Sequence, residues 1–282
     1  MESFAPTADL ADTGTDDFPA FCIAPALPLY DERRPAMRTR PFKAWHHFRE
    51  LLKNKESTEE VFRIFEALPW RGARARAEGW LKTPLAQQLR VSEPSIAAIL
   101  DDHAALRKLP AGSVGQLYCD FMECEGLSAQ GLIDEFERFL GDGPRFNDQF
   151  LWYYDRIRDT HDLLHILTGL GRDALGEASV LAYTYSQQPS PANLFISYAA
   201  GLNMKKQVGN SAPILGSIRE MQVMGRGCEP LAERSIRELL AMPLEEARAS
   251  IGITPPTTYH RAHELWKAQG IDPYDLLGKK AA

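Results

Sequence analysis

The sequence predicts an all-α protein with a single mainly helical domain. Apolar residues recur with helical spacing in several segments, and no segment shows the alternation of apolar and polar residues that is typical of a strand. The 282 residues contain no internal repeat and no central low-complexity linker. A chain of this length can therefore bury one substantial core.

Residues 1–30 are predicted to form a disordered acidic tail. The segment is rich in Ala, Asp, Thr and Pro and has few of the apolar residues that a core requires. Residues 1–32 contain seven Asp and Glu but neither Lys nor Arg, which is the opposite of a secretory or mitochondrial targeting sequence. We therefore expect a bacterial cytoplasmic protein, or a form that has already been processed.

Residues 31–255 are predicted to form the helical domain. Its first segment, residues 33–55, carries eight Lys and Arg and spaces Phe42, Trp45 and Phe48 for one helix face. A basic amphipathic helix can pack its apolar face into the core or lie on an anionic membrane surface. We expect the apolar face to join the core, and peripheral membrane contact is the alternative.

Further helices are predicted along the rest of the domain, and a C-terminal extension follows it. In order, the helices are residues 57–67, 96–108, 131–140, 150–167, 175–186, 193–204 and 214–224. Glycines separate helix 150–167 from helix 175–186, and prolines separate helix 175–186 from helix 193–204. Residues 256–282 form the extension, in which we expect His260 and His263 to be exposed.

The helix at residues 150–167 contains a pattern suited to metal binding. His161 and His165 are four residues apart, so both imidazoles project from one side of a helix, and Asp162 lies close to the same side. Two histidines and a carboxylate are ligands that divalent metals accept. A core or boundary role for these histidines is the alternative interpretation.

Glu177 strengthens the metal interpretation. An unbroken helix would place it about 18 Å from His165 along the axis. Gly169 and Gly171 instead supply a helix stop, and Asp173 can cap a new helix that returns Glu177 to the histidines. The predicted metal ligands are therefore His161, Asp162, His165 and Glu177, in a site between adjacent helices.

Several strings resemble one protein family. The string HDLLHILTGLGRDALGE at residues 161–177 resembles the signature of the Coq-four family of ubiquinone (coenzyme Q) biosynthesis proteins. LPAGSVGQLY at residues 109–118, MGRG at 224–227 and PLEEAR at 243–248 are similar to other segments of that family. The likeness runs from about residue 45 to about residue 255, is weak over the first hundred residues, and leaves residues 259–282 as an extra tail, so the resemblance implies no role for either end of the chain.

The resemblance implies an enzyme of coenzyme Q synthesis, a metal-dependent carbon–carbon lyase. The family is associated with removing the C1 carboxylate of a polyprenylated 4-hydroxybenzoate intermediate and replacing it with hydroxyl. One zinc ion is the implied cofactor, although iron, manganese or cobalt would also accept these ligands. The implied partners are the polyprenylated benzoate or quinone intermediate and other ubiquinone biosynthesis proteins, and a homodimer and contact with the inner membrane are further options.

Two residues of the same segment are candidate catalytic residues. Arg158 lies three residues before His161, so on a continuous helix it would share the metal-binding face and could pair with the departing carboxylate. Asp162 would either bind the metal or orient a histidine from outside the ligand set. A structural ion pair is the alternative role for Arg158.

Other functional classes fit the sequence less well. A lipid-binding scaffold with a structural metal is the main alternative, and a phosphohydrolase of the HD type would need further ligands such as His103 and Asp272. The net charge of −6 argues against a nucleic-acid partner. The cysteines, at positions 22, 119, 124 and 228, have no CxxC spacing, so neither a disulfide scaffold nor a cysteine metal site is predicted.

Overall fold

The computed structural model describes residues 27–55 and 57–276 and contains only helices as regular structure. Within these residues no β-strand forms, and one isolated antiparallel bridge pairs Ser113 with Pro243. The prediction of an all-α fold is confirmed. The predicted tail lies outside the described residues as far as residue 26.

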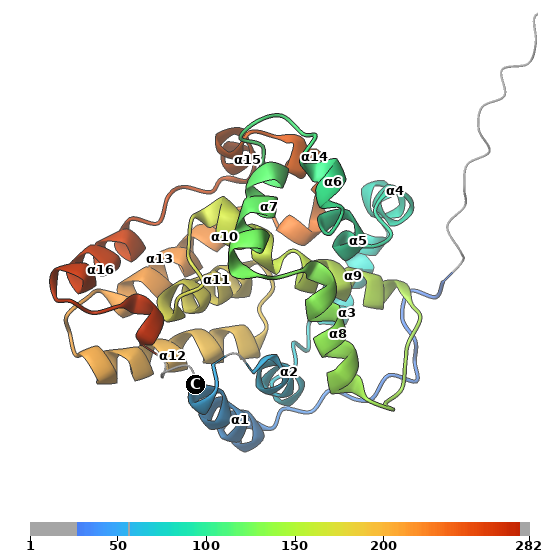
Figure 1. Ribbon diagram of the computed structural model, residues 1–282. Helices are drawn as coiled ribbons and strands as arrows, with labels where there is room; N and C mark the ends of the chain where they lie inside the picture. Colours follow the sequence, from blue (N-terminus) through green and yellow to red (C-terminus); the bar gives the residue numbers. More distant parts are fainter. Residues whose placement is uncertain (1–26, 56, 277–282) are drawn as a thin grey trace, which may run out of the picture.

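The helices follow one another with short connections (Figure 1). They are α1 (Pro41–Lys53), α2 (Thr58–Ala67), α3 (Ala73–Leu81), α4 (Pro84–Ser92), α5 (Ile96–Leu100), α6 (His103–Leu106), α7 (Val114–Glu125), α8 (Ala129–Leu140), α9 (Gln149–Asp159), α10 (His161–Thr168), α11 (Ala174–Gln187), α12 (Pro191–Val208), α13 (Ile214–Gly227), η1 (Leu231–Glu233), α14 (Ile236–Ala241), α15 (Leu244–Ile251), α16 (Thr257–Ala268) and η2 (Pro273–Asp275). Polar side chains cap the N-terminus of many of them, as Ser113 does for α7 and Asp173 for α11.

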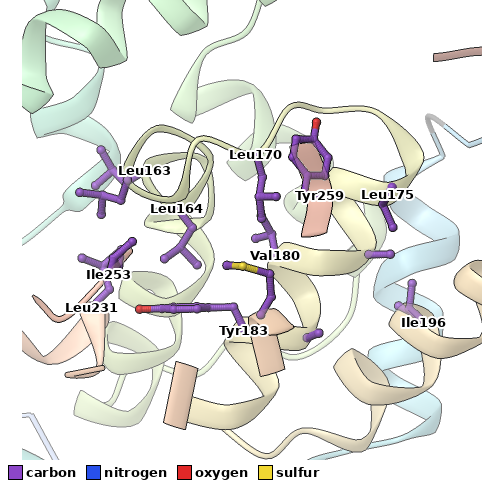
Figure 2. Close-up of a cluster of buried hydrophobic side chains, with 14 of the residues drawn as sticks. Leu163, Leu164, Leu170, Leu175, Val180, Tyr183, Ile196, Leu231, Ile253 and Tyr259 are labelled. Carbon is purple, nitrogen blue, oxygen red and sulfur yellow. The ribbon is translucent and has the colours of Figure 1, made fainter. Parts of the chain in front are cut away.

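The main core forms around α11, which packs along both α12 and α13. Figure 2 shows part of this core, with Leu163 and Leu164 of α10 near Tyr183 of α11. The Ser179 and Ser217 hydroxyls lie 3.1 Å apart between α11 and α13, so this helix contact is close. A smaller apolar cluster joins α3, α4 and α9 beside the main core.

Two helices predicted as continuous are each broken in two. The predicted helix 96–108 divides into α5 and α6, because the Asp102 carboxylate accepts a hydrogen bond from Ala105 N and starts a new helix. The predicted helix 150–167 divides into α9 and α10 at Thr160. The Thr160 hydroxyl donates a hydrogen bond to the Arg156 carbonyl at 2.7 Å. The backbone of Thr160 has a ψ of 2°, which departs from helical geometry.

The apolar residues of α1 do not all join the core. Phe48 is buried, but Phe42 is 89 % exposed and Trp45 is 54 % exposed. The expectation that one apolar face packs inward is therefore wrong for the first turns of this helix. None of the described helices is long and apolar enough to cross a membrane.

Both ends of the described chain pack against the helical domain. The carbonyls of Pro28 and Leu29, which we predicted to be part of the tail, accept hydrogen bonds from the first residues of α9. At the other end, α16 packs on α13 and contributes Tyr259 and Trp266 to the main core. His260 is exposed as predicted, whereas His263 is half-buried.

Candidate metal centre

The centre is built by α10, α11 and the connection between them. His161 and His165 are one turn apart on α10, which ends at Gly169 with a φ of +74°. This left-handed conformation suits glycine and turns the chain back towards α11. At Gly176 an added Cβ would lie 1.9 Å from the Gly171 carbonyl oxygen, so only glycine permits the close approach that brings Glu177 to the histidines.

His161, His165 and Glu177 form the metal-ligand group of the described residues, with one ligand atom from each lying within 4.8 Å of the others. Glu177 Oε2 lies 3.4 Å from His161 Nε2 and 3.5 Å from His165 Nε2. Two ligand atoms that are about 2.0–2.1 Å from one ion at a tetrahedral angle lie about 3.4 Å apart. The two distances therefore fit ligands that share one tetrahedral ion.

The surroundings of His165 leave one nitrogen available to a metal. Its Nδ1 lies 3.1 Å from the Leu170 carbonyl oxygen, which can only accept, so Nδ1 carries the proton and donates. Nε2 then carries the lone pair, is buried, and makes no hydrogen bond within the described part of the chain. Phe121 of α7 stacks on the ring with centroids 5.8 Å apart. A histidine nitrogen that has no hydrogen-bond partner, on a ring whose orientation is fixed through its other nitrogen, is suited to binding a metal.

Glu177 is held as an ionised carboxylate. Burial alone would raise its pKa, but His165 and His161 bring the pKa well below the ordinary value. Its second oxygen, Oε1, lies 3.6 Å from Nε of Arg172, which also approaches Glu125 at 3.4 Å. Glu177 thus directs one oxygen to the histidines and the other to an arginine.

The structure places the remaining predicted site residues differently. Asp162 is not a member of the metal-ligand group, although its charge contributes to raising the pKa of His165. Arg158 lies on α9, where its guanidinium contacts Asp159 at 2.7 Å and Asp155 at 2.8 Å. The break at Thr160 separates it from α10, so the assumption of one continuous helix face is wrong. The catalytic roles of Arg158 and Asp162 stay predictions.

Three contributors to the centre were not predicted from the sequence. The Leu170 carbonyl acts through the main chain, which side-chain spacing does not reveal. Phe121 comes from a helix distant in the sequence. Arg172 could be noted in the sequence only as a basic residue between the two segments that carry the ligands. His103 and Asp272, which a phosphohydrolase of the HD type would need, are absent from the metal-ligand group of the described residues.

The ligand set and its exposure favour a reactive site. Two histidines and one glutamate are the protein ligands of several catalytic zinc sites, whereas structural zinc sites usually have four protein ligands. His165 is buried, but the side chains of His161 and Glu177 are 29 % and 35 % exposed. One side of the group therefore faces solvent, where another molecule can approach a bound ion.

The sequence is similar to those of known proteins. Residues 78–257 match the family model of the coenzyme Q (ubiquinone) biosynthesis protein Coq4. The chain is 25 % identical over 178 residues to the mitochondrial ubiquinone biosynthesis protein COQ4 of the yeast Scheffersomyces stipitis, a match that covers 62 % of this chain and 52 % of that protein. It is 26 % identical over 177 residues to the mouse COQ4 homologue, covering 62 % of this chain and 63 % of the mouse protein.

A solved structure shares the fold. The crystal structure of a Nostoc punctiforme protein named for ubiquinone biosynthesis superposes with a TM-score of 0.51 and 19 % sequence identity. The match covers 76 % of this chain and 99 % of that one. This likeness supports the helical architecture. The two curated relatives named above are covered over only 52 % and 63 % of their lengths.

Proposed function

The chain belongs to the Coq4 family of coenzyme Q (ubiquinone) biosynthesis proteins, and from this premise we propose that it is a metal-dependent decarboxylase of ubiquinone biosynthesis. Its substrate in this proposal is a polyprenylated 4-hydroxybenzoate-type intermediate. The C1 carboxylate leaves as carbon dioxide and hydroxyl takes its place. The observation that carries the proposal is the group of His161, His165 and Glu177, open to solvent on one side.

The residues of the group fit a single divalent ion. His161 Nε2, His165 Nε2 and Glu177 Oε2 would hold it, because Glu177 Oε2 already lies at the spacing of a shared ligand from both nitrogens and all three atoms lie within 4.8 Å of one another. Such an ion would supply Lewis acidity, stabilising negative charge on a substrate carboxylate or phenolate oxygen. Zinc is the ion proposed first, and iron, manganese or cobalt would accept the same ligands.

Neighbouring residues would prepare the ligands for this task. The Leu170 carbonyl fixes the His165 tautomer, and Arg172 holds Glu177 Oε1 so that Oε2 points to the histidines. Asp162 acts in the proposal from outside the ligand set, as a negative charge near His165 that would also attract a bound cation. Arg158 is already paired with two aspartates, so receiving the substrate carboxylate would require it to leave them.

The exchange of carboxylate for hydroxyl is an oxidation and needs an oxygen source. Zinc has no redox chemistry of its own. In the proposal dioxygen is the two-electron oxidant: the carboxylic acid, dioxygen and water give the hydroxylated ring, carbon dioxide and hydrogen peroxide. The electron-rich phenol would react with dioxygen directly, or a redox-active ion held by the same ligands would supply the redox chemistry. The identity of the bound metal distinguishes these two routes.

A polyprenylated substrate resides in a membrane, and the outer face of α1 offers a surface for peripheral contact. Phe42 and Trp45 project from the first turns of this helix, and Arg49 and Lys53 follow on the same side. Exposed aromatic rings beside cations are typical of helices that lie on anionic lipid surfaces. We include such contact in the proposal.

The first test measures metal content and turnover together. Untagged wild type and His165→Ala are purified, bound metals are measured by elemental mass spectrometry, and conversion of the substrate is followed by mass spectrometry of the product. We expect about one equivalent of a divalent metal in the wild type, and neither metal nor product with the variant. His103→Ala is the matched control, because His103 pairs with Glu123 away from the centre.

The outcomes also separate the enzyme from a scaffold. A folded Glu177→Gln variant that loses turnover supports the enzyme. Bound metal without turnover in the wild type, with a melting temperature that falls on chelation, supports a lipid-binding scaffold with a structural metal. Wild type that binds no metal overturns the metal-dependent mechanism.

A further inference from the structure

The connection between α10 and α11, residues 169–173, is held in place by α16. The Tyr259 hydroxyl donates a hydrogen bond to Asp173 Oδ2 and accepts one from Gly171 N at 3.0 Å. His263, one turn along α16, places Nε2 3.2 Å from Asp173 Oδ1, and its ring centroid lies 4.2 Å from that of Tyr259. Tyr259 and Asp173 are buried, so water does not compete freely for these contacts.

The same connection sets the position of two metal ligands. The Leu170 carbonyl, next to Gly171, accepts the hydrogen bond from His165 Nδ1. Asp173 caps α11 by accepting from Leu175 N and Gly176 N, and its carbonyl accepts from Glu177 N at 3.0 Å. A displacement of Gly171 and Asp173 would therefore move the partner of one ligand and the helix start that carries the other.

Figure 2 shows Tyr259 inside this bend of the chain, with its hydroxyl directed towards the connection between the labelled Leu170 and Leu175. The hydroxyl bonds to the main chain at Gly171 and to the side chain of Asp173, which lie two residues apart in this connection. Its removal would leave Gly171 N without this acceptor and Asp173 Oδ2 without this donor in a buried environment. An unsatisfied buried group favours rearrangement of the segment that carries it.

We propose that Tyr259 is a positioning residue of the metal centre, with His263 supporting it at Asp173. Tyr259 acts on the metal through the connection, without touching it, by fixing the Leu170 carbonyl and the first turn of α11. This inference rests on the proposed function, because it assumes that His165 and Glu177 bind a metal. Tyr259 follows the end of the Coq4 family match at residue 257, so the family likeness does not account for it.

The test is the metal affinity of the full-length Tyr259→Phe variant, with Zn²⁺ and Co²⁺ alone as probes. The substitution keeps the buried ring and removes only the hydroxyl. Loss of groups that orient metal ligands typically weakens metal binding by about 10–100-fold. We expect the dissociation constant, measured by competition with a chelator, to rise by about tenfold, and the visible absorption of bound Co²⁺ to change.

Tyr198→Phe is the matched control. It removes the hydroxyl that donates to Gln222 Oε1 at 2.9 Å between α12 and α13, away from the connection. Its metal affinity should stay close to that of the wild type. Hydrogen exchange of the amides of residues 169–177 gives a second readout, and these amides should exchange faster in Tyr259→Phe but not in the control.

Each outcome decides the inference. If wild type binds metal and folded Tyr259→Phe binds it equally well, Tyr259 is only a packing residue and the proposed function stands. If wild type binds no metal, the proposed function fails and the inference fails with it. Should Tyr259→Phe not fold, His263→Ala removes the other contact to Asp173 and is expected to weaken metal binding in the same direction.

Discussion

The two ring nitrogens of His165 have different surroundings, and this difference controls how metal binding should respond to pH. Nδ1 is committed to the Leu170 carbonyl, so a second proton can bind only at Nε2, the atom that faces Glu177. Burial is the largest single effect and lowers the pKa of His165, but Glu177, Asp162 and the Leu170 carbonyl together raise it by more, so the pKa lies above its ordinary value of 6.5. A proton therefore competes with the metal for Nε2.

We predict that metal affinity falls as the pH decreases towards and below 6.5. His165 must lose its proton to bind metal, whereas Glu177, with a lowered pKa, stays ionised over this range. Isothermal titration of the metal-free protein with Zn²⁺ in buffers of different ionisation enthalpy measures the protons released. We expect close to one proton from His165 at pH 6 and fewer above pH 8, with the same profile for His103→Ala. Release that does not depend on pH would contradict this account.

At the scale of residues, the sequence predicted what depends on spacing within the chain. His161, His165 and Glu177 meet because two glycines end one helix and an aspartate starts the next, and all of these are visible in the sequence. The Leu170 carbonyl and the Tyr259 hydroxyl depend on a folded loop and a distant helix, so spacing could not predict them. The predicted place of Arg158 assumed an unbroken helix, which Thr160 interrupts.

At the scale of elements, α1 presents two faces with different partners. Ala44 and Phe48 face the core, and the Phe48 ring meets Phe195 of α12 with centroids 5.4 Å apart. Phe42 and Trp45 extend outwards, and in Figure 1 this helix lies at the edge of the molecule. The cationic residues of the same segment give this edge the charge that anionic lipids attract.

We predict that Phe42→Ala/Trp45→Ala weakens binding to vesicles that contain an anionic phospholipid. Each large ring that leaves water contributes roughly 1.5–3 kcal/mol when fully buried, so partial insertion of two rings should account for at least about tenfold in partitioning. Vesicle flotation measures the bound fraction. Leu85→Ala is the control, because it removes an exposed apolar side chain from α4. Equal binding by the double variant and the control would exclude α1 as the contact.

Helices were predictable from the sequence where their own periodicity was long enough. The segments that became α2, α8, α11, α12 and α13 were predicted to within a few residues, since each carries apolar residues over several turns, on one face in α2, α8 and α13 and around the helix in α11 and α12. The helices that were not predicted are α3, α4, α7, α14, α15 and α16, and of these α7 and α16 are as long as the predicted α8. Isolated helices shorter than about 12–15 residues are only marginally stable in water. Contacts with the rest of the molecule therefore stabilise these helices more than their local sequence pattern does.

At the scale of the whole molecule, a buried ion pair joins the smaller apolar cluster to the C-terminal part of the chain. Arg156 of α9 donates to Glu93 Oε2 at 2.8 Å and to the Ala232 carbonyl at 2.8 Å, and both charged side chains are fully buried. The other oxygen of Glu93 accepts from the Ser235 hydroxyl and from Arg237 N. Three segments distant in the sequence thus meet at one charge pair.

The sequence did not reveal this pair, because Glu93 and Arg156 are separated by 63 residues and neither belongs to a motif. We predict that Arg156→Ala lowers the free energy of unfolding by about 3–5 kcal/mol, since it leaves the Glu93 carboxylate buried without its counter-ion. Urea unfolding followed by circular dichroism measures the loss. Arg63→Ala, which breaks a more exposed pair with Glu59 within α2, should cost less than about 1 kcal/mol. An equally small loss in Arg156→Ala would mean that water reaches Glu93 and that apolar packing alone joins the two parts.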